Sequence, residues 1–79
     1  MVKLVYHGEL RDLVGCAEEE IDAASMRDVF RYIANRHGKK AGKIAKSGLV
    51  TRDGRKVMDV NEGLSPSSVV GFHPLCTGG

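Results

Sequence analysis

Hydrophobic and polar residues alternate over residues 2–7 ("VKLVYH") at the start of the chain. A period of two sends successive side chains to opposite faces, so this stretch predicts a strand with one buried face. Residues 17–23 ("AEEEIDA") predict a short edge strand in which Ile21 points inward and the glutamates discourage pairing with another sheet. The stretch 9–15 between them has apolar residues at turn-like spacing, and we expect it to form a short turn that makes the two strands antiparallel.

A different period begins at Ser25, because apolar residues then recur every three or four positions as far as His37. This spacing places one apolar stripe along a helix. Ser25 with Asp28 three residues later is a relaxed capping box, and Gly38 is a suitable residue to end the helix. The basic stretch 39–48 ("KKAGKIAKSG") is only weakly periodic, and it predicts a loop with a short helical turn.

The second half of the chain predicts three more strands. Two short strands surround Asp53-Gly54, a strong hairpin signal, and residues 69–72 ("VVGF") form the last strand before Pro74. One main helix must then cover one face of a mixed sheet of about four to five strands. The first and last strands are the most apolar, so we expect them side by side at the centre. The predicted fold class is α+β, with the β-grasp arrangement of ubiquitin.

Composition narrows the class of protein. The chain has 79 residues, 42% hydrophobic and 28% charged, which indicates one small folded domain rather than a disordered chain. A net charge of +2 is too small to argue for nucleic acid by itself. No apolar run approaches the roughly 18 residues of a membrane span, so we expect no membrane partner. The first residues lack the unbroken apolar run of a secretory signal, and we expect a cytoplasmic protein.

Residues with reactive side chains are few and scattered. Cys16 and Cys76 are far apart, so we expect free thiols rather than a structural disulfide. For Cys76 we favour a small apolar role over a part in sulfur chemistry. The acidic residues show no paired arrangement for acid–base catalysis, which favours a protein without an active site of its own. No metal site is expected, because the spacing of the histidines does not suit ligands: His7, His37 and His73.

Three pieces of the sequence match one family together. They are the start "VKLVYHGELRDLVG", the helix "ASMRDVFRYIANRHG", and the end, where Phe72, Pro74, Thr77, Gly78 and Gly79 fall in an apolar, Pro, small, Gly-Gly pattern. The chain resembles the ubiquitin-like sulfur carrier proteins, most closely the small subunit of molybdopterin synthase. Leu75 and Cys76 depart from the proline and valine that are usual at these positions.

The resemblance implies a single β-grasp sulfur carrier domain over residues 1–79, with a flexible C-terminal tail at 75–79. It implies that Gly79 is adenylated and converted to a thiocarboxylate, while Gly78 lets the backbone enter a narrow pocket. The sulfur would then serve molybdopterin synthesis. In this interpretation the protein is a carrier and not an enzyme. The residues expected to contact partners are Phe72, Pro74, Leu75 and Thr77.

The resemblance also implies the partners. They are an adenylating enzyme of the ubiquitin-activating type, a larger synthase subunit and a sulfur donor such as a cysteine desulfurase. No tightly bound cofactor is expected, because the activating partner uses the ATP. Two alternatives stay open: a carrier for thiamine or another sulfur-containing metabolite, and a β-grasp binding module with an inert tail. Such a module would contact an acidic partner or RNA through the lysines of 39–46.

Overall fold

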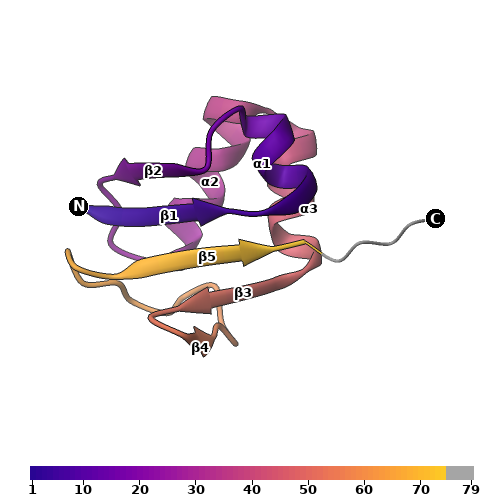
Figure 1. Ribbon diagram of the computed structural model, residues 1–79. Coiled ribbons are helices and arrows are strands. Elements are labelled where there is room, and N and C mark those ends of the chain that lie inside the picture. The colour runs from indigo at the N-terminus through magenta and orange to yellow at the C-terminus, as the bar shows by residue number, and fades with distance from the viewer. Residues whose placement is uncertain (75–79) are drawn as a thin grey trace.

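Eight helices and strands follow one another in the computed structural model, which describes residues 1–74 (Figure 1). In chain order they are β1 (Val2–Tyr6), α1 (Gly8–Val14), β2 (Glu18–Ile21), α2 (Met26–His37), α3 (Lys39–Ser47), β3 (Leu49–Arg52), β4 (Arg55–Lys56) and β5 (Val69–His73).

The five strands form one mixed sheet in the order β2-β1-β5-β3-β4. The central strands β1 and β5 are parallel, with Lys3 opposite Val69 and Tyr6 opposite Phe72, while the other neighbours are antiparallel. Helices α2 and α3 lie together behind the sheet in Figure 1. The predicted β-grasp α+β fold is confirmed, including the adjacent first and last strands.

Local signals explain the ends of α2 and of the β3–β4 hairpin. Ser25 Oγ accepts a hydrogen bond from the Asp28 backbone N–H at 3.4 Å, as the capping pattern predicts. Asp53 and Gly54 have φ values of 52° and 86°. Two consecutive positive φ values match the turn that an Asp-Gly pair favours between twisted strands.

Two segments differ from the prediction. Residues 8–14 form helix α1 rather than a turn, because Leu10 is fully buried and Gly15 ends the helix with φ 88°. The basic stretch after Gly38 forms helix α3 rather than a loop. Its buried side consists of small residues, Ala41, Gly42 and Ala45, whose apolar signal is weak in the sequence.

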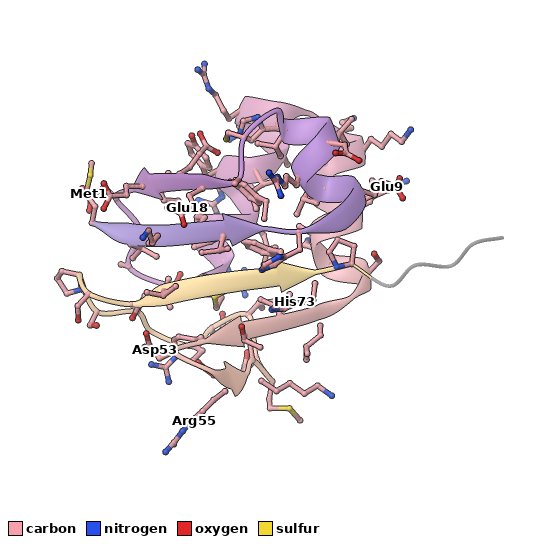
Figure 2. All side chains as sticks on the ribbon, viewed as in Figure 1. Met1, Glu9, Glu18, Asp53, Arg55 and His73 are labelled. Carbon is pink, nitrogen blue, oxygen red and sulfur yellow. The ribbon has the colours of Figure 1, made fainter. Side chains whose placement is uncertain are left out.

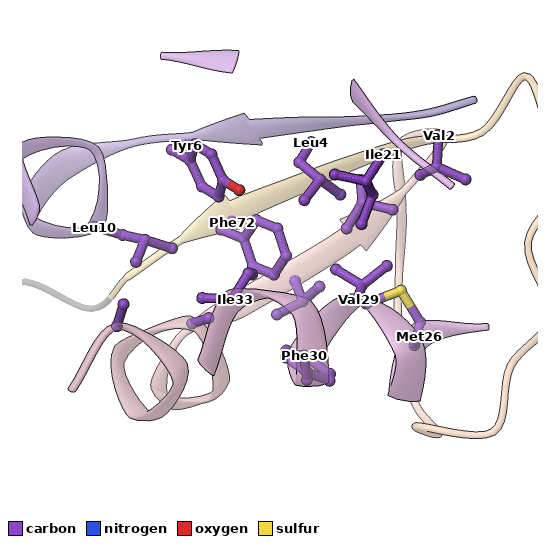
Figure 3. Packing of buried hydrophobic residues seen from close by; sticks show 14 residues of the cluster. Val2, Leu4, Tyr6, Leu10, Ile21, Met26, Val29, Phe30, Ile33 and Phe72 are labelled. Carbon is purple, nitrogen blue, oxygen red and sulfur yellow. The ribbon is translucent and has the colours of Figure 1, made fainter. Parts of the chain in front are cut away.

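The close contact between α2 and α3 depends on one of these small residues. A Cβ atom added at Gly42 would lie 3.1 Å from the Ala34 Cβ, tighter than an ordinary contact. The core fills the space between these helices and the sheet (Figure 3). Its largest buried side chains are Tyr6, Phe72, Leu4, Leu10, Met26 and Ile33.

Across residues 1–74, no helix has the length and hydrophobicity that crossing a bilayer requires.

Candidate functional site: the end of the central strand

The last strand comes directly before the C-terminal segment that holds most of the site residues predicted from the sequence. Strand β5 lies between β1 and β3, and its hydrogen-bonded pairing continues to His73, opposite Leu49. Pro74, which follows, is half-buried and has no N–H to donate to the ladder. The sheet therefore holds the chain firmly up to the residue before Pro74, and Figure 2 shows His73 at this end of β5.

Two imidazole rings stack beside this end of the strand. The rings of His7 and His73 have centroids 4.5 Å apart and an angle of 14° between their planes. They come together because β1 and β5 are parallel with Tyr6 opposite Phe72, so the next residue of each chain segment lies alongside. Both histidines are exposed, and their stacked rings form a flat polar surface at the end of β5.

The face of the sheet turned away from the helices leads up to this pair. We call it the sheet outer face and define it by Val5, Val69, Gly71, His73, Leu49 and Thr51, whose positions alternate along their strands with core-facing residues. Leu49 and Val69 are 41% and 40% exposed, a large fraction for apolar side chains. An apolar surface next to a functional segment is typical of protein–protein contact.

Gly71 lies at the centre of the sheet outer face and leaves room for its neighbours. A Cβ atom there would lie 2.8 Å from Thr51 Oγ1 and 3.1 Å from His73 Nε2. Both distances are shorter than normal contacts, so glycine allows the hydroxyl and the imidazole to lie close over the backbone of β5.

A second group of ionisable side chains is centred on Glu19. Its Oε1 accepts hydrogen bonds from the Tyr6 hydroxyl and from His37 Nε2, both at 2.7 Å, and its Oε2 accepts one from the Tyr32 hydroxyl at 2.8 Å. Burial alone raises the pKa of the Glu19 carboxyl, but these three hydrogen bonds outweigh it and lower the pKa. Burial and the adjacent carboxylate raise the pKa of the Tyr6 phenol. Tyr6 in turn stacks on Phe72, so this group ties β1, β2 and α2 to the core.

We expect the fold to lose the stabilisation from Glu19 in acid. A lowered carboxyl pKa stabilises the fold above the ordinary value of 4.5, and this contribution is lost as the pH falls through the folded-state pKa. Glu19→Gln should therefore reduce the free energy of unfolding by about 2 kcal/mol at pH 7, and by progressively less as the pH falls below 4.5. Urea denaturation at several pH values measures this difference.

The neighbouring residue offers a matched control. Glu18 is exposed, and its ion pair among the described residues is a surface contact with Lys3 at 3.3 Å. Glu18→Gln should change the stability by less than about 1 kcal/mol at any pH. Equal losses for the two substitutions at pH 7 would contradict the role given to the Glu19 hydrogen bonds.

Residues 1–74 hold few other side chains with candidate chemistry. No three side chains of the types that bind metals gather in this part of the chain. Cys16 is a free, half-buried thiol that packs beside the core. Lys39, Lys40, Lys43 and Lys46 are all exposed on α3.

The comparisons with known proteins agree with this geometry. No protein-family model matches the chain, and a search of curated proteins gives no significant match. Among solved structures, a putative molybdopterin converting factor, subunit 1, from Pyrococcus furiosus is 32% identical, with a TM-score of 0.78. The match covers 92% of this chain and 94% of that one.

The chain belongs to the ubiquitin-like sulfur carrier family. Two further structures share the fold of this carrier at lower identity. SAMP1 from Haloferax volcanii is 17% identical with a TM-score of 0.78, over 99% of this chain and 98% of that one. A chain of the Amycolatopsis orientalis BexX/CysO complex is 16% identical with a TM-score of 0.80, over 100% of both chains.

The structure corrects one site residue of the carrier. Phe72, expected to contact partners, is fully buried, stacks on Tyr6 at 5.7 Å and meets the Phe30 ring edge to face at 6.1 Å. It belongs to the core, because it shares its side of β5 with buried Val70. Pro74 follows the last residue of β5, and its contact with partners stays a prediction. The other predicted residues, Leu75, Thr77, Gly78 and Gly79, lie outside the described residues, as does Cys76.

Three surface residues of the carrier were missed as candidates for partner contact: His7, His73 and Leu49. His7 and His73 become neighbours only through the parallel pairing of β1 and β5, whose register the sequence does not state. Leu49 carries a signal that could have found it. It precedes buried Val50 in a short strand, so it must face the opposite side of the sheet.

Proposed function

We propose that this protein carries sulfur as a thiocarboxylate at Gly79 and delivers it for the synthesis of molybdopterin. The observation that supports this most strongly is the 32% identity, over 92% of the chain, to the putative molybdopterin converting factor, subunit 1. The sequence supports it further, because Gly78 and Gly79 follow the central strand after only a short segment.

The chemistry explains the pair of glycines. A carboxylate is a poor electrophile, so a Gly79 carboxylate oxygen first attacks the α-phosphorus of ATP, giving an acyl-adenylate and releasing pyrophosphate. Hydrosulfide then attacks the carbonyl carbon, AMP leaves with the bonding electrons, and a thiocarboxylate remains. The adenylate must be shielded from water, so the partner pocket is narrow. Residues without side chains, Gly78 and Gly79, let the backbone enter it.

The partners supply the catalytic side chains in this proposal, and the carrier supplies surfaces that they bind. An adenylating enzyme, a larger synthase subunit and a sulfur donor each act on the same terminus in turn. The sheet outer face, with Leu49 and the stacked His7 and His73, lies next to the end of β5 and is the described surface best placed for docking. Pro74, Leu75 and Thr77 would contact the walls of the partner pocket.

An intact-mass measurement tests the proposal. The protein is incubated with a lysate of its source, ATP and sodium sulfide, and parallel samples omit ATP or sulfide. We expect a mass gain equal to sulfur replacing oxygen, located in the C-terminal peptide and dependent on both additions. A terminus that stays a plain carboxylate, in a lysate that modifies a known sulfur carrier, would favour the binding module with an inert tail.

A second measurement tests the acceptor. The purified thiocarboxylate form is mixed with the larger molybdopterin synthase subunit of the same source, with and without the pterin precursor. Loss of the sulfur only when the precursor is present supports the molybdopterin role. Loss of the sulfur to the thiazole-forming enzyme of thiamine synthesis instead would move the carrier to that pathway.

The docking role of the sheet outer face leads to a prediction with a close control. Leu49→Asp should lower the rate of thiocarboxylate formation about tenfold, because a buried, unpaired charge opposes an apolar contact. Leu13 on α1 has the same exposed fraction, 41%, but does not lie on the sheet. Leu13→Asp should leave the rate unchanged. Equal rates for the two variants, both with wild-type thermal stability, would rule out docking through Leu49.

A further inference from the structure

The helix side of the molecule has a groove that the carrier role does not use. It consists of two adjoining hollows of about 340 and 240 Å³, both open to solvent, which share Phe30, Lys46 and Val60. The walls come from α2, the end of α3 and the segment 56–60, which begins at the last residue of β4. We call this feature the basic groove. None of its lining residues belongs to the sheet outer face.

Positive charge is concentrated in the basic groove. Four cationic side chains line it, together with a single carboxylate, that of Asp59. The resulting charge of +3 exceeds the +2 of the whole chain. The four cations are Arg27, Arg31, Lys46 and Lys56. Within residues 1–74, none of them has a carboxylate oxygen within 4.0 Å, whereas Lys3 and Arg52 do.

The floor of the basic groove is apolar. Phe30 is 8% exposed and lies below the Lys46 ammonium, whose Nζ is 5.5 Å from the ring centroid. Val60 is 42% exposed and Met58 is 79% exposed at the edge of the groove. Methionine is flexible and polarisable, and it is common on surfaces that adapt to a bound segment. An apolar side chain of a ligand would therefore find contacts between the cations.

The segment that forms one wall is held against α2 before any ligand arrives. The backbone N–H groups of Met26 and Arg27 donate to the carbonyls of Glu62 and Val60 at 3.0 and 2.8 Å. These are first-turn groups of a helix, which have no partner inside the helix itself. The Arg27 guanidinium also donates to Asn61 Oδ1 at 2.7 Å. A wall fixed in this way reduces the entropy lost on binding.

We propose that the basic groove binds an acidic peptide segment of a protein partner, with a hydrophobic side chain between carboxylates. The four cations select negative charge, and the exposed apolar side chains of Val60 and Met58 at the edge of the groove select an apolar anchor. An open groove suits a segment of chain, since sites for small molecules enclose most of their ligand. RNA is disfavoured, because the aromatic ring in the groove is covered and cannot stack on bases.

This binding goes beyond the proposed sulfur carrier function and does not depend on it. The basic groove and the sheet outer face share no residues, so a partner bound in the groove leaves the sheet outer face and the end of β5 uncovered. A failure to bind acidic peptide would leave the thiocarboxylate measurements unaffected. A failure to form the thiocarboxylate would likewise leave the peptide-binding measurements unaffected, so the two proposals can fail separately.

The test uses a fluorescein-labelled acidic peptide of Asp and Glu residues with a central Leu-Phe pair. Its binding to the full chain is followed by fluorescence anisotropy. A second peptide replaces Leu-Phe by Ser-Ser, and an oligouridylate of equal charge serves as a different polyanion. We expect saturable binding of the Leu-Phe peptide, roughly tenfold tighter than binding of the Ser-Ser peptide. Equal affinities for the two peptides, or tighter binding of the oligouridylate, would overturn the proposal.

A pair of double variants locates the site. Arg31→Glu with Lys46→Glu reverses two charges in the basic groove, and Lys39→Glu with Lys40→Glu reverses two exposed charges outside it. Both double variants lower the net charge of the protein by the same amount. The groove variant should weaken peptide binding at least roughly tenfold, and the control variant less than about twofold. Equal weakening by the two would show binding to overall charge and overturn the assignment.

Chemical-shift mapping locates the peptide site without any substitution. It is needed if the charge reversal at Lys46 weakens the end of α3. The Leu-Phe peptide is titrated into ¹⁵N-labelled protein. The largest amide shifts are expected at Arg31, Lys46, Met58 and Val60, which the groove brings together from three segments. Shifts concentrated instead on the sheet outer face would place the peptide there and refute binding in the groove.

Discussion

Replacement of Phe72 by alanine is expected to destabilise the fold by about 3–5 kcal/mol. The phenyl ring is fully buried, stacks on Tyr6 and meets Phe30 edge to face, so its removal leaves a cavity at the centre of the core. Small domains are stable by only about 5–15 kcal/mol in total, so most of the margin disappears. Urea denaturation followed by circular dichroism measures the loss.

The neighbouring Leu49 distinguishes a core role for Phe72 from a docking role. Leu49 lies one residue from Val50, which is directly opposite Phe72, yet its side chain is 41% exposed on the other face of the sheet. Leu49→Ala should cost less than about 1 kcal/mol. A Phe72→Ala variant that remains as stable as Leu49→Ala, and loses only partner binding, would restore Phe72 to the docking surface.

The hydrophobic pattern of the sequence predicts some elements of this fold well. Strand β1 and helix α2 have strong periods of two and of three to four residues, and each was predicted with nearly its true bounds. The capping pattern at Ser25 and the Asp53-Gly54 turn act through neighbouring residues only, so they were visible too. Local interactions therefore predict most of the individual strands and the main helix.

Helices α1 and α3 were missed because their stability comes from packing. Helix α1 has a single buried residue, Leu10, in seven residues, which is too short for a period to emerge. Helix α3 buries alanine and glycine against α2, and its lysines dominate the pattern that the sequence presents. Gly42 lowers helix propensity on its own, yet it is needed for the approach to Ala34. The stability from this packing arises between two helices, so the sequence of one helix does not reveal it.

The candidate site also has residues that the sequence alone reveals and residues that only the fold brings together. The glycine pair and Pro74 stand out in the sequence because they are unusual residues in a recognisable order. The stacked His7 and His73 are 66 positions apart by number, and only the register of β1 and β5 brings them together. The basic groove likewise joins α2, α3 and the segment 56–60 through tertiary contacts. Surfaces formed by several elements need the fold before they can be predicted.

Deletion of Gly79 is expected to abolish thiocarboxylate formation while the thermal stability stays unchanged. Within residues 1–74 the buried core ends at Phe72, and a glycine has no side chain to add to it. The deletion shortens the chain by one residue, about 3.5 Å of extended backbone, so the carboxylate no longer reaches the α-phosphorus of ATP. Gly78→Val should act less completely, with a roughly 100-fold lower rate, because a side chain misplaces the carboxylate in a narrow pocket. Pyrophosphate release by the adenylating enzyme of the same source measures both rates.

Two further variants separate the effect of the length of the C-terminal segment from the effect of side-chain size. Gly78→Ala adds a single methyl group and should retain more activity than Gly78→Val, since the obstruction grows with side-chain size. Thr77→Val keeps the size of the residue outside the narrowest part and should be close to wild type. Together these variants should give an order of rates set by bulk and by distance from the carboxylate. If Gly78→Val and the Gly79 deletion both released pyrophosphate at the wild-type rate, the two glycines would have no part in activation. The function would then depend on the folded surfaces, and the binding module with an inert tail would be the better account.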